Sequence, residues 1–149
     1  KGISGAVSDG RKVEPVTHTG PVIADLYEKA VNLYKGDFLS GQQDSTWSAS
    51  LRENIKDEFI LLCYKAGEFY ESIKEWDKGI ECYKTVSGID NLREDSYRRM
   101  MSCNIKAGLN GEALAVYNRC NNMLHLAHSA GPSREMEALR HRVMENGNF

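Results

Sequence analysis

The chain has 149 residues, of which 41% are hydrophobic and 27% are charged, an ordinary composition for one soluble globular domain. Its formal net charge of −2 at pH 7 argues against nucleic-acid binding, which usually requires a strongly basic face. The chain carries no apolar run long enough to cross a bilayer and no signal-peptide pattern at its start. We therefore expect a cytoplasmic protein without membrane contact.

The first 20 residues lack the periodic apolar pattern of a helix. They hold few bulky apolar side chains, which predicts a flexible leader or a linker from a neighbouring domain over residues 1–20. Because the first residue is Lys1 and not Met, we expect the chain to be part of a longer protein. Residues 21–149 are predicted to form one helical-repeat domain.

A helix is predicted over residues 21–35. Pro21 suits the first helical turn, and Gly36 ends the helix. Apolar residues recur at helical spacing and predict one buried stripe: Ile23, Leu26, Tyr27, Ala30, Val31 and Tyr34.

An extended loop is predicted over residues 36–50, and a long second helix follows it. Three large apolar residues are expected to anchor the loop against the domain: Phe38, Leu39 and Trp47. Ser50 followed by Glu53 is a capping-box signature that predicts the start of the second helix. The apolar stripe of that helix runs through Leu51, Ile55, Phe59, Leu62, Ala66, Phe69 or Tyr70, and Ile73.

The rest of the chain predicts four more helices, over residues 75–87, 92–107, 110–128 and from Ser133 onward. Asp90 is the expected N-cap of the helix over 92–107, and Gly108 is expected to end it in the C′ position. Ser133, after Gly131 and Pro132, is expected to cap the last helix. The inward face of the helix over 92–107 is predicted to include Leu92, Tyr97, Met100, Met101 and Ile105.

Two stretches, residues 74–86 and 108–120, look like one unit used twice. Gly79 matches Ala113 and Tyr83 matches Tyr117, each at a separation of about 34 residues, the tetratricopeptide period. The small residue would let the two helices of a unit approach closely, and the tyrosine would fill the groove toward the next unit. On the first helix, Gly67 and Tyr70 match the corresponding small and aromatic positions.

These features predict an all-α fold, a tetratricopeptide-like right-handed stack of antiparallel helix pairs (an α-α superhelix) with a C-terminal capping helix. The alternative is an unrelated helical bundle whose spacing agrees by accident.

The four cysteines, Cys63, Cys82, Cys103 and Cys120, each fall within a predicted helix and form no CxxC pair. Core packing is the favoured interpretation, with a disulfide or a metal site as the alternatives. Among the histidines, His125 and His128 lie one helical turn apart, but no carboxylate or cysteine completes a ligand set. No nucleotide-binding or hydrolase motif is present. We expect no catalytic residue, no cofactor and no metal, and hence no enzyme.

Several strings resemble the bacterial transcriptional activator domain, the helical-repeat module that follows a winged-helix domain in antibiotic regulatory protein family regulators. The most specific string is Tyr-Lys-Gly-Asp-Phe-Leu over residues 34–39, and the others include residues 89–94 and 131–136. The family usually has Gly where this chain has Lys74, and Asp-Pro where it has Asp90-Asn91. The resemblance implies a domain that mediates self-association, as in a homodimer, or contacts neighbouring domains or the transcription machinery.

The repeat register places the first helix of each unit on a concave surface. Mixed charge with a few apolar groups suits a peptide or a partner helix there. The predicted partner-binding residues are Leu61, Tyr64, Glu68, Glu71, Ser72, Asp95, Arg98, Ser102, Ile105 and Lys106.

The resemblance favours a regulatory and protein-interaction domain of a bacterial transcription regulator whose DNA-binding domain lies outside this chain. A free-standing tetratricopeptide-type adaptor that scaffolds protein partners is the alternative. A third hypothesis is a small-molecule sensor with a pocket among Trp47, Trp76 and the tyrosines.

Overall fold

The computed structural model describes residues 19–35 and 46–147, and every described element is a helix. The six helices are α1 (Thr19–Lys35), α2 (Thr46–Ser72), α3 (Trp76–Ile89), α4 (Glu94–Lys106), α5 (Asn110–His128) and α6 (Arg134–Asn146). The all-α prediction is confirmed. The predicted leader falls almost entirely outside the described residues, as do Phe38 and Leu39 of the predicted loop.

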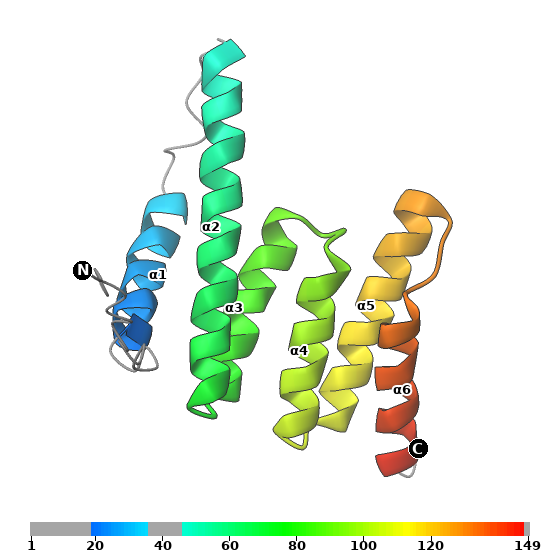
Figure 1. Ribbon diagram of the computed structural model, residues 1–149. Helices are drawn as coiled ribbons and strands as arrows, with labels where there is room; N and C mark the ends of the chain where they lie inside the picture. Colours follow the sequence, from blue (N-terminus) through cyan, green and yellow to red (C-terminus); the bar gives the residue numbers. More distant parts are fainter. Residues whose placement is uncertain (1–18, 36–45, 148–149) are drawn as a thin grey trace, which may run out of the picture.

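The helices form a tetratricopeptide-like stack in which each helix packs against the next one along the chain. Helix α4 also contacts α6, and ion pairs join α4 to α2. Figure 1 shows α2, α4 and α6 in one layer, with α3 and α5 on the other side of the stack. The right-handed sense of the stack stays a prediction.

Helix α2 begins at Thr46, four residues before the predicted capping box at Ser50 and Glu53. Trp47 is therefore part of the helix, and its predicted place in a loop is wrong. The sequence between Thr46 and Ser50 contains neither Pro nor Gly, so a helix nucleated further along the chain extends through it at little cost.

The predicted N-cap role of Asp90 is also wrong, because α4 begins at Glu94 with Arg93 at the N-cap position. Asp90 instead follows the end of α3, and its carboxylate accepts hydrogen bonds from the Leu92 backbone N–H at 3.2 Å and from Arg93 Nε at 3.1 Å. Leu92 consequently lies in the turn and is 39% exposed, whereas the sequence predicts it to face inward.

Three other residues predicted to be apolar-stripe members are exposed. Leu51 lies near the start of α2, Ile73 directly follows its last residue, and Leu26 lies on α1, the first described helix. The contacts of α1 with the rest of the fold are made by a narrower set that lies along its packed side: Ile23, Ala24, Tyr27, Ala30 and Val31.

The core extends through the whole stack in three clusters of buried side chains. The four cysteines are fully buried and unpaired, one on each helix from α2 to α5. Burial raises the pKa of each thiol to about 12. The core-packing interpretation of the cysteines is confirmed.

Between α2 and α3, Gly67 on α2 has less room for a side chain than Gly79 on α3. A Cβ added to Gly79 would lie 3.5 Å from the Gly67 carbonyl oxygen, an ordinary van der Waals contact. A Cβ added to Gly67 would lie 2.5 Å from Tyr83 Cζ, which is far inside contact distance. Ala113, the counterpart of Gly79, is fully buried on α5.

The two repeat tyrosines share one contact, an arginine over the ring, although the Tyr83 hydroxyl bonds Glu71 on α2 and the Tyr117 hydroxyl bonds Glu137 on α6. Tyr83 on α3 is fully buried beneath the Arg99 guanidinium of α4, 5.9 Å from the ring centroid. Tyr117 on α5 lies in the same way beneath Arg140 of α6, at 5.5 Å. Each tyrosine therefore contacts an arginine of the following helix layer, as the predicted repeat requires.

The turns inside the two units are also equivalent. Lys74 and Gly108 both have left-handed backbone, with φ of 61° and 78°. The next residue in each turn donates its N–H to a carbonyl five residues back, Glu75 to Tyr70 and Leu109 to Asn104, which is the Schellman pattern. The prediction that Gly108 ends its helix at C′ is confirmed. Lys74 takes the same conformation with a Cβ, at an energetic cost.

Candidate functional site

The predicted residues of α2 share one side of that helix because their spacing is three or four. Leu61 is 48% exposed and Glu68 is exposed, whereas Tyr64 and Glu71 are partly buried. Ser72, at the end of the helix, is exposed and donates its hydroxyl to the Phe69 carbonyl oxygen at 2.6 Å. The α2 part of the predicted surface therefore combines exposed and partly buried side chains, and only the exposed ones are open to a partner.

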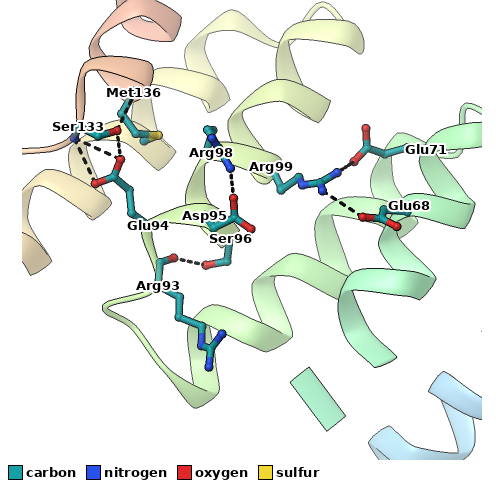
Figure 2. Close-up of polar contacts among 10 residues, drawn as sticks. All are labelled: Glu68, Glu71, Arg93, Glu94, Asp95, Ser96, Arg98, Arg99, Ser133 and Met136. Carbon is teal, nitrogen blue, oxygen red and sulfur yellow. Dashed lines mark hydrogen bonds and ion pairs between the residues drawn. The ribbon is translucent and has the colours of Figure 1, made fainter. Parts of the chain in front are cut away.

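Ion pairs join this side of α2 to α4. Arg99 contacts Glu68 at 3.0 Å and Glu71 at 3.8 Å, and Lys106 contacts Glu71 at 3.0 Å. Figure 2 shows the Arg99 guanidinium directed at both glutamates. The two helices thus present a continuous surface held by charge pairs.

Glu71 is the centre of this network. Its carboxylate accepts the Tyr83 hydroxyl at 2.6 Å and the Lys106 ammonium at 3.0 Å. Burial alone would raise the pKa of Glu71, but these two hydrogen bonds and the neighbouring cations lower it below its usual value. Glu71 is therefore ionised and occupied by partners from its own chain, which makes it a structural residue of the surface.

The other predicted residues of α4 differ in how available they are. Arg98 and Asp95 are both about half exposed and form an ion pair with each other. Ser102 and Ile105 are partly buried, and Ile105 packs against the largest core cluster. Lys106 is also about half exposed but pairs with Glu71, so Arg98 is the predicted cation of α4 that is not tied to α2.

Tyr64 has more contact with the core than a binding anchor would. Its ring lies 5.9 Å from that of Tyr83 and packs against two of the core clusters. Its hydroxyl is the only buried side-chain polar atom of the described residues that makes no hydrogen bond. Burial, with the Asp95 carboxylate nearby, raises the pKa of Tyr64 to about 12. Replacing Tyr64 with alanine would therefore disturb folding as well as any surface.

An open pocket of about 560 Å³ lies between α4 and α6. Its lining combines two predicted residues, Arg98 and Ser102, with five that the sequence analysis missed: Arg99, Glu135, Ala138, Leu139 and Arg142. The repeat pattern could have identified the missed residues on α6. Helix α6 follows the α2–α3 and α4–α5 pairs, so it takes the position of the first helix of a next pair, but the sequence analysis interpreted it only as a cap.

Helix α6 is fixed against α4 by its own N-terminus. Ser133 caps α6 as predicted, accepting the Met136 N–H at 3.4 Å. The Glu94 carboxylate of α4 accepts the backbone N–H of Ser133, at 3.1 Å from one oxygen, and also its hydroxyl (Figure 2). This contact sets the position of the pocket wall. We use the name α2–α4–α6 face for the surface formed by these side chains: Leu61, Tyr64, Glu68, Glu71 and Ser72 on α2; Asp95, Arg98, Arg99, Ser102, Ile105 and Lys106 on α4; and Glu135, Ala138, Leu139 and Arg142 on α6.

Within residues 19–35 and 46–147, no group of three or more His, Cys, Asp and Glu side chains is arranged to hold a metal ion. His125 and His128 are exposed in the last turn of α5. No helix of this part of the chain has the length and apolar character needed to span a membrane.

The comparisons with known proteins agree with the fold. The family model of the bacterial transcriptional activator domain matches residues 7–144, which is most of the chain. No curated protein and no solved structure matches the chain. That family is a regulatory family and not an enzyme family. Given its helical repeats and this match, the chain belongs to the bacterial transcriptional activator domain family.

Proposed function

We propose that this chain is the regulatory, protein-interaction domain of a bacterial transcription regulator whose DNA-binding domain lies outside residues 1–149. The family match over residues 7–144 is the observation that carries the proposal. The stack supports it because repeat helices of this kind build extended recognition surfaces. Cytoplasmic localisation follows from this role.

The α2–α4–α6 face is the surface we assign to the partner. It offers exposed charged groups at Glu68, Arg98 and Arg142, with an open pocket between α4 and α6. The partner is another domain of the parent protein, a second copy of this chain or a component of the transcription machinery. Analytical ultracentrifugation of the isolated chain distinguishes the second copy from the other two.

The test is a promoter-reporter assay with the full-length regulator. Glu68→Lys and Arg98→Glu reverse charges on the face, whereas Lys84→Glu reverses one on α3, on the other side of the stack. We expect the two face variants to change promoter output with unchanged protein level and unchanged DNA affinity, and Lys84→Glu to leave the output as it is. Wild-type output from both face variants would contradict the assignment of the surface.

A free-standing adaptor is the second candidate, because the described helices bury a complete core without help from another domain. The sequence of the full-length gene product separates the two candidates. A winged-helix domain in that sequence supports the regulator, and its absence supports the adaptor.

A further inference from the structure

The pocket between α4 and α6 has an unusual balance of charge for a chain that is acidic overall. Three of its seven lining residues are arginines, Arg98, Arg99 and Arg142, and only Glu135 is acidic. The whole chain has a formal net charge of −2. Arg98 and Arg99 have carboxylate partners within the chain, so Arg142 and the unused donors of Arg98 are the groups through which the pocket can bind an anion.

The three arginines differ in how far partners within the chain already occupy them. Arg99 is held by Glu68 and Glu71 and covers the Tyr83 ring. Arg98 pairs with Asp95 but is 44% exposed at its side chain. Arg142 is exposed and forms no ion pair within the described part of the chain. A guanidinium carries five N–H donors, so Arg98 can bind a second carboxylate while it keeps Asp95.

The remaining lining residues add an apolar surface beside these cations. Leu139 is partly buried and packs against the largest core cluster, and Ala138 is exposed one position before it. Both belong to α6, which Glu94 and Ser133 fix against α4. An apolar group of a ligand would therefore meet a surface that is already in position, next to Arg98 and Arg142.

We propose that this pocket binds an acidic peptide segment of the protein partner, with carboxylates on Arg98 and Arg142 and an apolar side chain against Leu139 and Ala138. This inference rests on the proposed function, whose partner class it specifies. Arginine binds a carboxylate through two parallel hydrogen bonds, so the interaction fixes the orientation of the carboxylate in addition to the attraction between the charges.

A nucleic acid would also present anions to the arginines, but the surroundings oppose it. Asp95 and Glu68 already pair with Arg98 and Arg99, so the pocket has too few available cations for a continuous run of phosphates, whereas one or two carboxylates need only Arg142 and the remaining donors of Arg98. The apolar surface of Leu139 has no counterpart in such a backbone. The observations favour an acidic segment with an apolar side chain.

The test measures fluorescence anisotropy of a short labelled peptide of alternating glutamate and leucine residues with the complete 149-residue chain. A matched peptide carries glutamine in place of glutamate. Arg142→Glu is the principal variant because Arg142 is exposed and its replacement leaves the core intact. Arg119→Glu on α5 is the control, with the same change of charge at an exposed position outside the pocket.

We expect the glutamate peptide to bind, the glutamine peptide to bind at least about fivefold more weakly, and Arg142→Glu to weaken the glutamate peptide by about fivefold or more. Arg119→Glu should leave the affinity within about twofold, since its charge lies outside the site. Equal weakening by Arg142→Glu and Arg119→Glu, or equal affinity for the two peptides, would overturn the inference. Displacement of the peptide by single-stranded DNA at a lower concentration than by unlabelled peptide would also overturn it.

The two proposals fail in different experiments. If the face variants change promoter output but the glutamate peptide does not bind, the acidic-segment inference is wrong and the proposed function stands. If the peptide binds as expected but neither Glu68→Lys nor Arg98→Glu changes promoter output, the pocket is supported and the proposed regulatory use of the face is wrong.

Discussion

Replacing Gly67 with alanine would place a methyl group against a side chain that has no room to move. The added Cβ would lie 2.5 Å from Tyr83 Cζ, 2.6 Å from Cε1 and 2.9 Å from the hydroxyl oxygen. The Tyr83 ring is fully buried, and its hydroxyl donates to Glu71 at 2.6 Å. To admit the methyl group, the ring must shift and weaken this hydrogen bond, and the packing between α2 and α3 must also be strained.

The magnitude follows from three opposing contributions. Overpacking a core costs about 1–3 kcal/mol, and a hydrogen bond to a charged group contributes about 1.5–3 kcal/mol. Replacing Gly with Ala inside a helix returns about 1 kcal/mol. We expect Gly67→Ala to lower the free energy of unfolding by about 2–4 kcal/mol. For a domain of this size that is a decrease in Tm of about 6–12 °C.

Urea denaturation followed by circular dichroism measures the change. Gly88→Ala is the matched control, because no heavy atom lies within 4 Å of a Cβ added there in α3, and we expect it to gain about 0.5 kcal/mol. In a Tyr83→Leu background, Gly67→Ala should cost at least about 1 kcal/mol less than in the wild type. Wild-type stability of Gly67→Ala, or an equal loss in both backgrounds, would refute the packing argument.

Three further predictions concern stability. Lys74→Gly should raise the free energy of unfolding by about 0.5–1 kcal/mol, because it removes a Cβ from left-handed backbone. The control Lys84→Gly, inside α3, should lower it by about 1 kcal/mol. A lower free energy of unfolding for Lys74→Gly would be inconsistent with the left-handed turn. Tyr64→Phe should change the free energy of unfolding by less than about 0.5 kcal/mol, since it removes a hydroxyl without a hydrogen bond, whereas Tyr83→Phe should cost about 1.5–3 kcal/mol; the opposite ranking in chemical denaturation would contradict the two assignments. The pKa of Glu71 is lowered on folding, so its carboxylate stabilises the fold above its unfolded pKa of about 4.3 and stops doing so as the pH falls through the lower folded value. Glu71→Gln should therefore lower the free energy of unfolding more at about pH 7 than at about pH 3. Equal losses at both pH values would count against the Glu71 network.

Much of the fold could be predicted from local signals. Helix α5 has the predicted bounds, Ser133 caps α6 and Gly108 ends its unit in left-handed backbone. Each of these depends on a residue type whose preference is strong and local. Lys74 adopts the left-handed conformation of its repeat counterpart Gly108, which the residue type of Lys74 does not indicate.

The wrong predictions concern helix boundaries and exposed side chains that tertiary contacts or competing local hydrogen bonds determine. Asp90 has the side chain of an N-cap, but its carboxylate binds the turn that precedes α4. The start of α2 at Thr46 has no cap signal of the kind that Ser50 and Glu53 provide. Leu26 belongs to a helical stripe, yet it is 50% exposed and is not among the α1 side chains that pack against the described core clusters.

The candidate face was predicted in part. The register identified Arg98 and Ser102 as lining residues, but it did not identify which charges are already paired. Glu71 is occupied by Tyr83 and Lys106, and only the structure makes this visible. The contribution of α6, including Arg142, depends on the contact between Glu94 and Ser133, whose spacing in the sequence carries no recognisable pattern.

The most direct test of recognition on the α2–α4–α6 face is a map of backbone amide chemical shifts in the isotope-labelled chain as the glutamate–leucine peptide is added. We predict shifts concentrated in α4 and α6 around Arg98, Ser102 and Arg142, with little change in α3 and α5. Shifts centred on α3 and α5, or no shifts at peptide concentrations that saturate the anisotropy signal, would contradict the account.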